Sequence, residues 1–261
     1  MTFNYQYRLL YLVLMLSIPA AIIVAAYTSW WYLLASFVWS TIINTVFVQI
    51  GLHRYFSHSG FATGPLRHRF LAIGCFLAGG GSAISWSTHH MHHHRYSDSQ
   101  NDLHSPTEGW WHSAFAWPIQ NQSYFENKKH IGVVPKHLVR DHTVMWAHKH
   151  YFRFWIVAII VCGAISWQLL LFGLLFPAAG SLLRGNIMTN TLSHLRLPGS
   201  YQNYHDTHDH SYNNRWIQFF QIGEGLHNNH HHNMRNYNQA MKTGEWDPAA
   251  WLIDKFFKVS A

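Results

Sequence analysis

Charged residues and cysteines are scarce in this sequence of 261 residues. Charged side chains make up 11% of it, against about 25% in an average soluble domain, which argues against an ordinary soluble protein. The two cysteines, Cys75 and Cys162, lie in apolar stretches and form no CxxC pair. We therefore expect no disulfide framework and no cysteine metal site, and interpret both as small core residues.

Acidic residues are also few, with 11 Asp and Glu against 18 Lys and Arg. The basic residues are not gathered on a recognition motif, so we expect no nucleic-acid partner. A membrane surface or a phosphate-bearing substrate explains the net charge of +7 better.

Apolar residues make up 49% of the chain and aromatic residues 16%. Two apolar runs, at about 9–27 and 31–52, are each near the ~20 residues that cross a bilayer, and a third block at 154–191 has room for two short spans. The glycine-containing run from Phe70 to Trp86 is predicted to be a buried or interfacial helix. The sequence thus predicts an all-α integral membrane protein, a single domain over 1–261, with four transmembrane helices as two hairpins.

The remaining segments, 53–153 and 195–261, are polar and rich in histidine, lysine and arginine. An excess of lysine and arginine is typical of cytoplasmic segments of membrane proteins. We therefore predict that these segments form a cytoplasmic helical cap that holds a di-metal site, with the active site on the cytoplasmic side.

The chain contains 23 histidines, and many of them are clustered internally. Three histidine boxes and a fourth element lie at the predicted membrane boundaries or in the cap. The first box is His53–His58, the second is His90–His94, the third is His227–His231, and the fourth element is Asn190–His194. The candidate metal-binding residues in these four elements are His53, His58, His90, His93, His94, Asn190, His194, His227, His230 and His231.

The spacing within each box indicates which side chains can point toward the same place. Residues i, i+3 and i+4 share a face of an α-helix, so the second and third boxes can each converge, as can Asn190 and His194. His53 and His58 are five apart, about 140° around an α-helix, and are expected to serve two metals or to lie at a helix end. Nine histidines are too many for one ion. Imidazole suits several transition metals, so ligand type alone does not select one.

Other histidines have simpler interpretations. His89, His92 and His232 flank the boxes and are expected to be neighbours rather than ligands. Ordinary hydrogen-bonded roles are expected for the isolated histidines, which are His68, His112, His130 and His205.

Nearby acids can accept the free ring N–H of a ligating histidine and so fix its tautomer. The candidates are Asp98, Asp102, Asp206, Asp209 and Glu224. The alternative for each is a helix cap or an ion pair with Arg95 or Arg215.

These motifs in combination resemble the membrane fatty-acid desaturase family, most nearly its stearoyl-CoA (delta-9 acyl-CoA) desaturase branch. The resemblance covers about residues 30–235. The strings that carry it are Gly51 to His58, Trp86 to Asp98, Asp102-Leu103-His104, Asn190 to His194, Asp209 to Asn214 and Gly223 to His231.

The resemblance implies two Fe²⁺ ions, with O₂ as co-substrate. It implies one iron on His53, His90, His94 and His230 with a water held by Asn190, and the other on His58, His93, His194, His227 and His231. The family commonly has proline where Leu103 and Met234 stand, and the second hairpin is short for the family.

By resemblance, the expected function is O₂-dependent desaturation of a saturated fatty acyl thioester or lipid, giving a cis double bond. The termini leave no room for a fused electron carrier, so a separate donor of ferredoxin or cytochrome b type, with its reductase, is expected. Trp86 is a candidate wall of an apolar acyl tunnel, with ordinary packing as the alternative. Lys128, Lys129 or Arg153 are candidates to meet a phosphate-bearing headgroup, against the alternative of a merely charged face.

Two other functions stay open. A related di-iron lipid hydroxylase or ketolase would carry nearly the same boxes, although the string from Gly223 to His231 favours a desaturase. A membrane metal-binding or transport protein would need a row of ionisable groups within its spans, and the apolar runs lack one.

Overall fold

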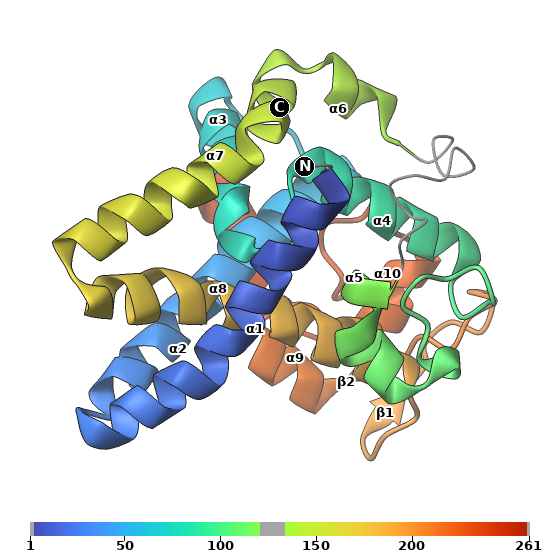
Figure 1. Ribbon diagram of the computed structural model, residues 1–261. Coiled ribbons are helices and arrows are strands. Elements are labelled where there is room, and N and C mark those ends of the chain that lie inside the picture. The colour runs from blue at the N-terminus through green and yellow to red at the C-terminus, as the bar shows by residue number, and fades with distance from the viewer. Residues whose placement is uncertain (1–2, 121–133, 260–261) are drawn as a thin grey trace.

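The computed structural model describes residues 3–120 and 134–259, and these are mostly helical. Figure 1 shows the long helices extending to one side and the shorter ones gathered at the other end. The elements of the first half are α1 (Phe3–Tyr27), α2 (Trp31–Ile43), η1 (Asn44–Ser57), α3 (Pro65–Gly74), η2 (Cys75–Ala78), α4 (Ala83–Tyr96), η3 (Pro106–Glu108), η4 (His112–Ala116) and α5 (Trp117–Gln120).

The second half begins with a short helix and a long one and ends in short helices, in the segment predicted to form the cap. Its elements are α6 (Lys136–Arg140), α7 (His142–Ile165), η6 (Leu169–Leu175), α8 (Phe176–Arg184), η7 (Gly185–Thr191), η8 (Leu192–His194), β1 (Ser200–Tyr201), β2 (Asn213–Asn214), α9 (Arg215–Gln221), α10 (His227–His232), α11 (Pro248–Leu252) and η9 (Ile253–Phe257).

Three continuous helical stretches in the described residues are long and apolar enough to cross a membrane: Tyr5–Tyr27, Trp31–Ser57 and Leu169–His194. They support the prediction of a membrane protein. The first two are joined by a turn of a few residues and contain the predicted runs 9–27 and 31–52, which supports the first hairpin.

The run from Phe70 to Trp86 was predicted to be one helix. In the structure it is instead the junction of two helices. Pro65–Ala78 and Ala83–Tyr96 meet at 75° and together would count as a fourth, broken span. Gly79 (φ 70°) and Gly81 (φ 102°) lie at the break. Glycine adopts these left-handed backbone angles without steric cost, so the glycines permit the sharp bend.

The region predicted to form the second hairpin is less regular than the region predicted to form the first. Helix α7 begins at His142, inside the segment predicted as cap, where the Asp141 carboxylate accepts hydrogen bonds from two backbone N–H groups at 2.9 and 3.0 Å. The chain turns back after Ile165 into Leu169–His194. Within the described residues α7 is not among the helices that are long and apolar enough to cross a membrane, although it has 24 residues. The four-span arrangement therefore stays a prediction.

Polar side chains fasten the span Leu169–His194 to α2 and η1. Ser36 Oγ donates to the Phe172 carbonyl (2.6 Å), and Asn44 Nδ2 donates to the Ser181 carbonyl (3.3 Å). Arg184 faces the protein, with Nη1 2.9 Å from Thr41 Oγ1. Such contacts satisfy polar groups where water is absent.

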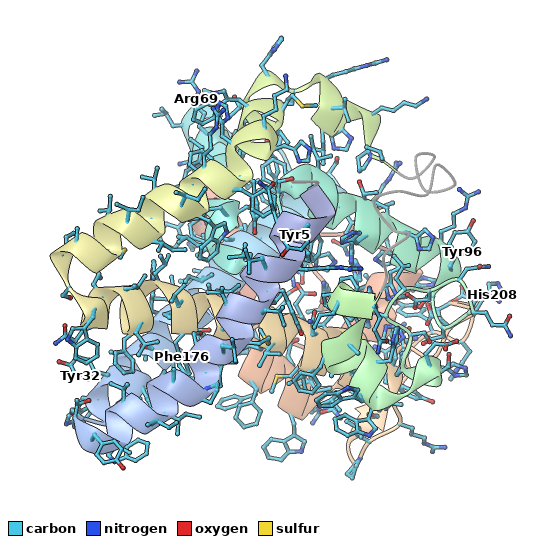
Figure 2. All side chains as sticks on the ribbon, in the orientation of Figure 1. Tyr5, Tyr32, Arg69, Tyr96, Phe176 and His208 are labelled. Carbon is cyan, nitrogen blue, oxygen red and sulfur yellow. The ribbon has the colours of Figure 1, made fainter. Side chains whose placement is uncertain are left out.

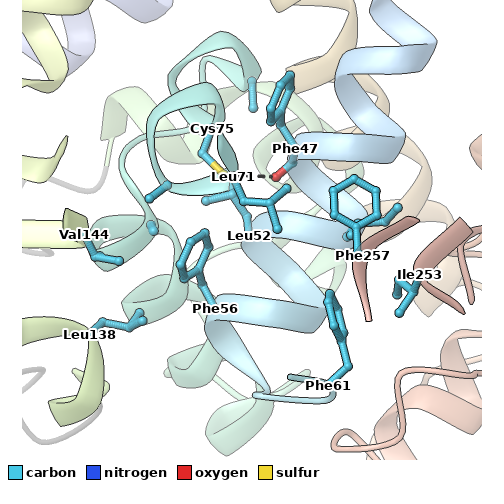
Figure 3. Close-up of a cluster of buried hydrophobic side chains, with 14 of the residues drawn as sticks. Phe47, Leu52, Phe56, Phe61, Leu71, Cys75, Leu138, Val144, Ile253 and Phe257 are labelled. Carbon is cyan, nitrogen blue, oxygen red and sulfur yellow. Dashed lines mark hydrogen bonds between the residues drawn. The ribbon is translucent and has the colours of Figure 1, made fainter. Parts of the chain in front are cut away.

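A buried apolar cluster fixes the end of η1 that carries the first box. Figure 3 shows Phe56 and Leu52 of η1 packed with Leu71 of α3 and with Phe257 near the C-terminus. The Cys75 thiol donates to a backbone carbonyl in the same cluster, at 3.4 Å. Both cysteines are free, and Cys75 is buried as expected for a core residue.

A polar network holds the third box within the cap. The short strands β1 and β2 pair antiparallel, with Tyr201 opposite Asn213. The Glu245 carboxylate accepts from Asn203 Nδ2 at 2.6 Å and from Asn229 Nδ2 at 2.7 Å. Asn229 is itself fully buried between two histidines of the box. These bonds set the position of α10 relative to the rest of the cap.

Candidate metal centre

The first box lies at the end of η1, which is π-helical. The backbone N–H of His58 donates to the carbonyl of His53 at 3.2 Å, an i to i+5 bond. Such winding brings residues five apart onto nearly the same face. The two imidazole centroids are 5.0 Å apart. Of the two alternatives, the structure agrees with a helix end, since η1 ends at Ser57 and His58 is its C-cap residue. The other alternative, that the two histidines serve different metals, assumed 3.6 residues per turn and does not match their position in one group.

The second box lies on α4, directly after the bend. The helix begins after Ser82, whose hydroxyl accepts from the backbone N–H of Ser85 at 3.3 Å. His90 and His94, four apart, point to one group of histidines, whereas His93 points to another. The box therefore serves two sites from one helix.

The third box forms the short helix α10 and divides in the same manner. His227 and His231, four apart, belong to one group, and His230 belongs to the other. The approach to the box depends on Gly225, because a Cβ there would overlap the backbone of Gln218. No larger residue fits this contact without moving a strand or helix end.

The fourth element ends the span Leu169–His194 and completes the set. The His194 ring is buried and its Nε2 lies 3.0 Å from Nε2 of His227. Asn190 donates to Asn186 Oδ1 at 3.5 Å. Asn190 also lines a cavity together with His53 and His90.

The candidate histidines thus form two groups, in each of which the ring nitrogens lie within 4.8 Å of one another. The first cluster is His53, His58, His90, His94 and His230. The second cluster is His93, His194, His227 and His231. Apart from His58, the two clusters group the histidines as the family resemblance implies, and His58 lies in the first cluster because of the π-helical winding of η1. That each cluster holds an ion stays a prediction.

The spacing of the nitrogens fits a bound cation. In the first cluster the Nε2 atoms of His58 and His90 are 2.7 Å apart, and those of His53 and His230 are 2.9 Å apart. Two imidazole nitrogens at about 2.1 Å from one ion and at right angles to each other are about 3.0 Å apart. The nitrogens therefore stand at the separation that a shared ion requires.

Buried carboxylates accept the Nδ1–H of one histidine in each element. The distances are 3.0 Å for Glu224 to His53, 2.9 Å for Asp102 to His93, 2.8 Å for Asp98 to His194 and 2.5 Å for Asp209 to His231. Each such bond leaves Nε2 with a lone pair, the form that binds a metal. These four predicted acids therefore contact the clusters, whereas Asp206 bonds the exposed His232 at 3.0 Å, outside them.

Several of the Nε2 atoms have another imidazole Nε2 at hydrogen-bond distance, between 2.7 and 3.0 Å. Within the described residues, Nε2 of His231 is buried and has no hydrogen-bond partner. Burial lowers the pKa of His231 to about 4 and holds the pKa values of His227 and His230 well below 6.5. Neutral imidazoles with an unshared lone pair are the donors that divalent transition metals bind, so the residues fit a metal centre.

A cavity of about 70 Å³ adjoins the first cluster. Trp86 lies in its wall and stacks on His90, with ring centroids 4.7 Å apart. Small or apolar residues of three other segments complete this end of the cavity, among them Val48, Ala78, Gly80 and Leu182. Trp86 thus faces the cavity, and its contact with a substrate stays a prediction.

Two residues that contribute to the site were not predicted from the sequence. His104 is buried beside His93, with ring centroids 4.5 Å apart, and burial lowers its pKa to about 3. Its only signal was the Asp102-Leu103-His104 string. Arg54 was noted only as part of the first box, yet its guanidinium contacts Glu224 at 3.4 Å and Asp247 at 2.8 Å.

Of the residues given ordinary roles, His68 contacts Tyr55 and Asp141, and His112 contacts the Leu103 carbonyl. His205 is exposed. Three others, His130, Lys128 and Lys129, lie outside the described residues. Arg153 is exposed on α7.

Comparison with known proteins gives a consistent result. The sequence model of the family described as "Fatty acid desaturase" matches residues 4–243. A probable lipid desaturase (ADS3.2, chloroplastic) of Arabidopsis thaliana is 31% identical over 75% of this chain and 53% of its own length. Delta-9 acyl-lipid desaturase 2 of the same plant is 27% identical over 92% and 76%. A probable acyl-CoA desaturase of Schizosaccharomyces pombe is 31% identical over 79% and 43%. The chain thus spans about half the length of the first and third of these relatives.

Proposed function

Because the chain belongs to the fatty acid desaturase family, we propose that it is an O₂-dependent fatty acyl desaturase that introduces a cis double bond into a saturated acyl chain. The observation that carries this proposal is the pair of histidine clusters, one of which opens on a largely apolar cavity. A site that binds metal beside a space for hydrocarbon suits chemistry on an alkyl chain.

Two iron ions are proposed as the cofactors. The first cluster, with His58 included, would hold one ion, and the second cluster would hold the other. Asn190, on the cavity wall, is proposed to hold a water at the centre. Iron, when bound, supplies the activation of O₂ that no amino-acid side chain provides.

The protein's own residues orient the centre and keep it dry. Glu224, Asp102, Asp98 and Asp209 fix the ring orientation and tautomer of four ligands. Burial of the remaining imidazoles keeps them unprotonated at neutral pH. Trp86 is proposed to press the acyl chain against the first cluster, since a fixed geometry decides which carbon reacts.

The substrate and the partners are proposed on the family likeness. The relatives' names mention acyl lipids and acyl-CoA, and a fatty acyl thioester or lipid is the proposed substrate here. Electrons are proposed to come from a separate ferredoxin or cytochrome b type donor with its reductase. The metal centre is proposed to face the cytoplasm, and the exposed Arg153 is a candidate contact for a phosphate-bearing headgroup.

The proposal is tested by expression in membranes with a reductant, followed by gas chromatography of the total fatty acids. A new cis-alkenoic acid is expected, and His93→Ala or His230→Ala should abolish it. His232→Ala, next to the third box but outside both clusters, is the matched control and should retain product. Unchanged product from His93→Ala and His230→Ala would contradict the ligand assignment, and an oxygenated product would instead identify a hydroxylase or ketolase.

A further inference from the structure

Helix α9 is amphipathic in the reverse sense of a helix on a water-exposed surface. Its polar side chains Gln218 and Gln221 are buried against the protein. Its outward face carries three aromatic side chains, with exposed fractions of 68%, 69% and 52%: Trp216, Phe219 and Phe220. A helix at a water surface places its polar residues outward, so this face indicates an apolar neighbour.

The depth of α9 is set by its C-terminal residue. The Gln221 side chain donates to the Arg184 carbonyl at 2.8 Å and to Thr189 Oγ1 at 2.9 Å. The Gln221 carbonyl accepts from the side chain of Gln49. Residues 49, 184 and 189 all lie inside the second and third candidate spans. Helix α9 is therefore fixed beside the spans and not above them, as Figure 1 shows for α9 and α8.

The C-terminal segment carries further exposed aromatic rings, one of which lies beside α9. Gln218 Nε2 donates to the carbonyl of Trp246 at 2.7 Å, which places this exposed tryptophan beside α9. Two further exposed rings, Trp251 and Phe256, are in edge contact with centroids 6.3 Å apart. We call the whole set the aromatic collar; it consists of Trp216, Phe219, Phe220, Trp246, Trp251 and Phe256.

Basic residues flank the aromatic collar. Arg215 precedes Trp216, and Lys255 and Lys258 stand on either side of Phe256 along the chain; all three cations are exposed. The exposed acid among them, Asp254, lies 3.8 Å from Lys258 and is partly neutralised by it. Exposed aromatic rings bordered by lysine and arginine are typical of segments that lie in the headgroup region of an anionic leaflet.

We propose that the aromatic collar is a membrane-docking surface, which inserts into the lipid leaflet beside the spans at the level of the boundary between headgroups and acyl chains. The cap would then be held against the bilayer by α9 and the C-terminal segment as well as by the spans. This inference stands independently of the reaction that the metal centre performs.

The test uses the full chain in nanodiscs of phosphatidylcholine and phosphatidylglycerol. Nitroxide labels are placed at Trp216→Cys, Phe219→Cys and Phe220→Cys, in a background with Cys75→Ala and Cys162→Ala. Two exposed positions serve as references. Leu16→Cys, on the outer face of α1, reports lipid, and Asp206→Cys reports water. Asp206 lies two residues from His208, which Figure 2 places at the opposite end of the molecule from Tyr32 in the first hairpin.

The relaxation of each label by membrane-dissolved O₂ and by a water-soluble nickel chelate is measured separately, and the two values are compared. We expect the three α9 labels to follow Leu16, with relaxation by O₂ exceeding relaxation by nickel. Labels that follow Asp206 would overturn the proposal. So would labels shielded from both reagents with dipolar broadening between chains, because that result identifies a second copy of this chain as the occupant. The three sites share one face, so two of them decide the matter if one variant does not fold.

Discussion

The Nη1 atom of Arg54 lies 2.8 Å from Oδ2 of Asp247, and both side chains are buried. The same guanidinium contacts Glu224, which accepts the Nδ1–H of His53. Asp247 also caps α11, since its carboxylate accepts from the Ala250 N–H at 3.0 Å. A buried ion pair thus connects the first histidine box to the C-terminal segment.

Replacing Asp247 with alanine should destabilise the protein by about 3–5 kcal/mol, because it breaks a buried ion pair and leaves the Arg54 charge with only the more distant carboxylate of Glu224, at 3.4 Å. Thermal unfolding in detergent measures the effect. Asp254→Ala, which removes the partly exposed pair with Lys258, is the control and should change stability by less than about 1 kcal/mol. Equal losses in the two variants would contradict the role assigned to the buried pair.

The position of His58 predicts which substitutions remove the same metal ion. His58→Ala and His94→Ala should each lose about one iron per chain, and the double variant should lose no more, because both residues belong to the first cluster. His58→Ala combined with His227→Ala should lose about two. Iron content by plasma mass spectrometry, with His232→Ala as the control, distinguishes this grouping from one in which His58 pairs with His227.

The carboxylate behind His231 should matter for metal affinity without being a ligand. The hydrogen bond from His231 lowers the pKa of Asp209 well below its usual range, although burial alone would raise it. Asp209→Asn should weaken iron binding about 10–100-fold. Asp206→Asn is a matched control, because it alters the same kind of bond to the exposed His232, outside both clusters. Competition with a chelator measures both variants, and equal affinities would be evidence against this role.

Gly225 should not tolerate a side chain, since its Cβ position is occupied by the Gln218 backbone. Gly225→Ala is expected to prevent correct folding of the third box, seen as loss of bound iron and of folded protein in detergent. Gly185→Ala is the control, because a Cβ there meets no atom within 4 Å. An unaffected Gly225→Ala variant would show that the contact is readily relaxed.

The candidate ligands could be selected from the sequence because histidine is recognised as a metal ligand from its residue type alone. The i, i+3, i+4 spacing predicted that all three histidines of the second box converge, and likewise those of the third. This was right for the pairs four apart but wrong for His93 and His230, which belong to the other cluster. The family resemblance separated them, whereas helical periodicity could not, because it does not show that a helix lies between two sites. His58 could not be placed, since the sequence does not distinguish π-helical from α-helical winding.

The supporting residues were harder to predict because they are brought together by the tertiary fold. Arg54 and Asp247 are separated by 193 residues, and no local pattern relates them. The bend between α3 and α4 was missed for another reason. Glycines permit a break, but whether the chain bends there depends on the packing around it.

The first cluster joins parts of the chain that are far apart: the Nε2 atoms of His53 and His230 are 177 residues apart in sequence and 2.9 Å apart in space. An ion shared by these nitrogens would act as a cross-link that closes a very long loop, and the entropy of the unfolded chain would fall accordingly. Iron supply would then govern the survival of the folded chain as well as its activity. In an iron-starved cell, the first consequence would be loss of the protein itself through proteolysis.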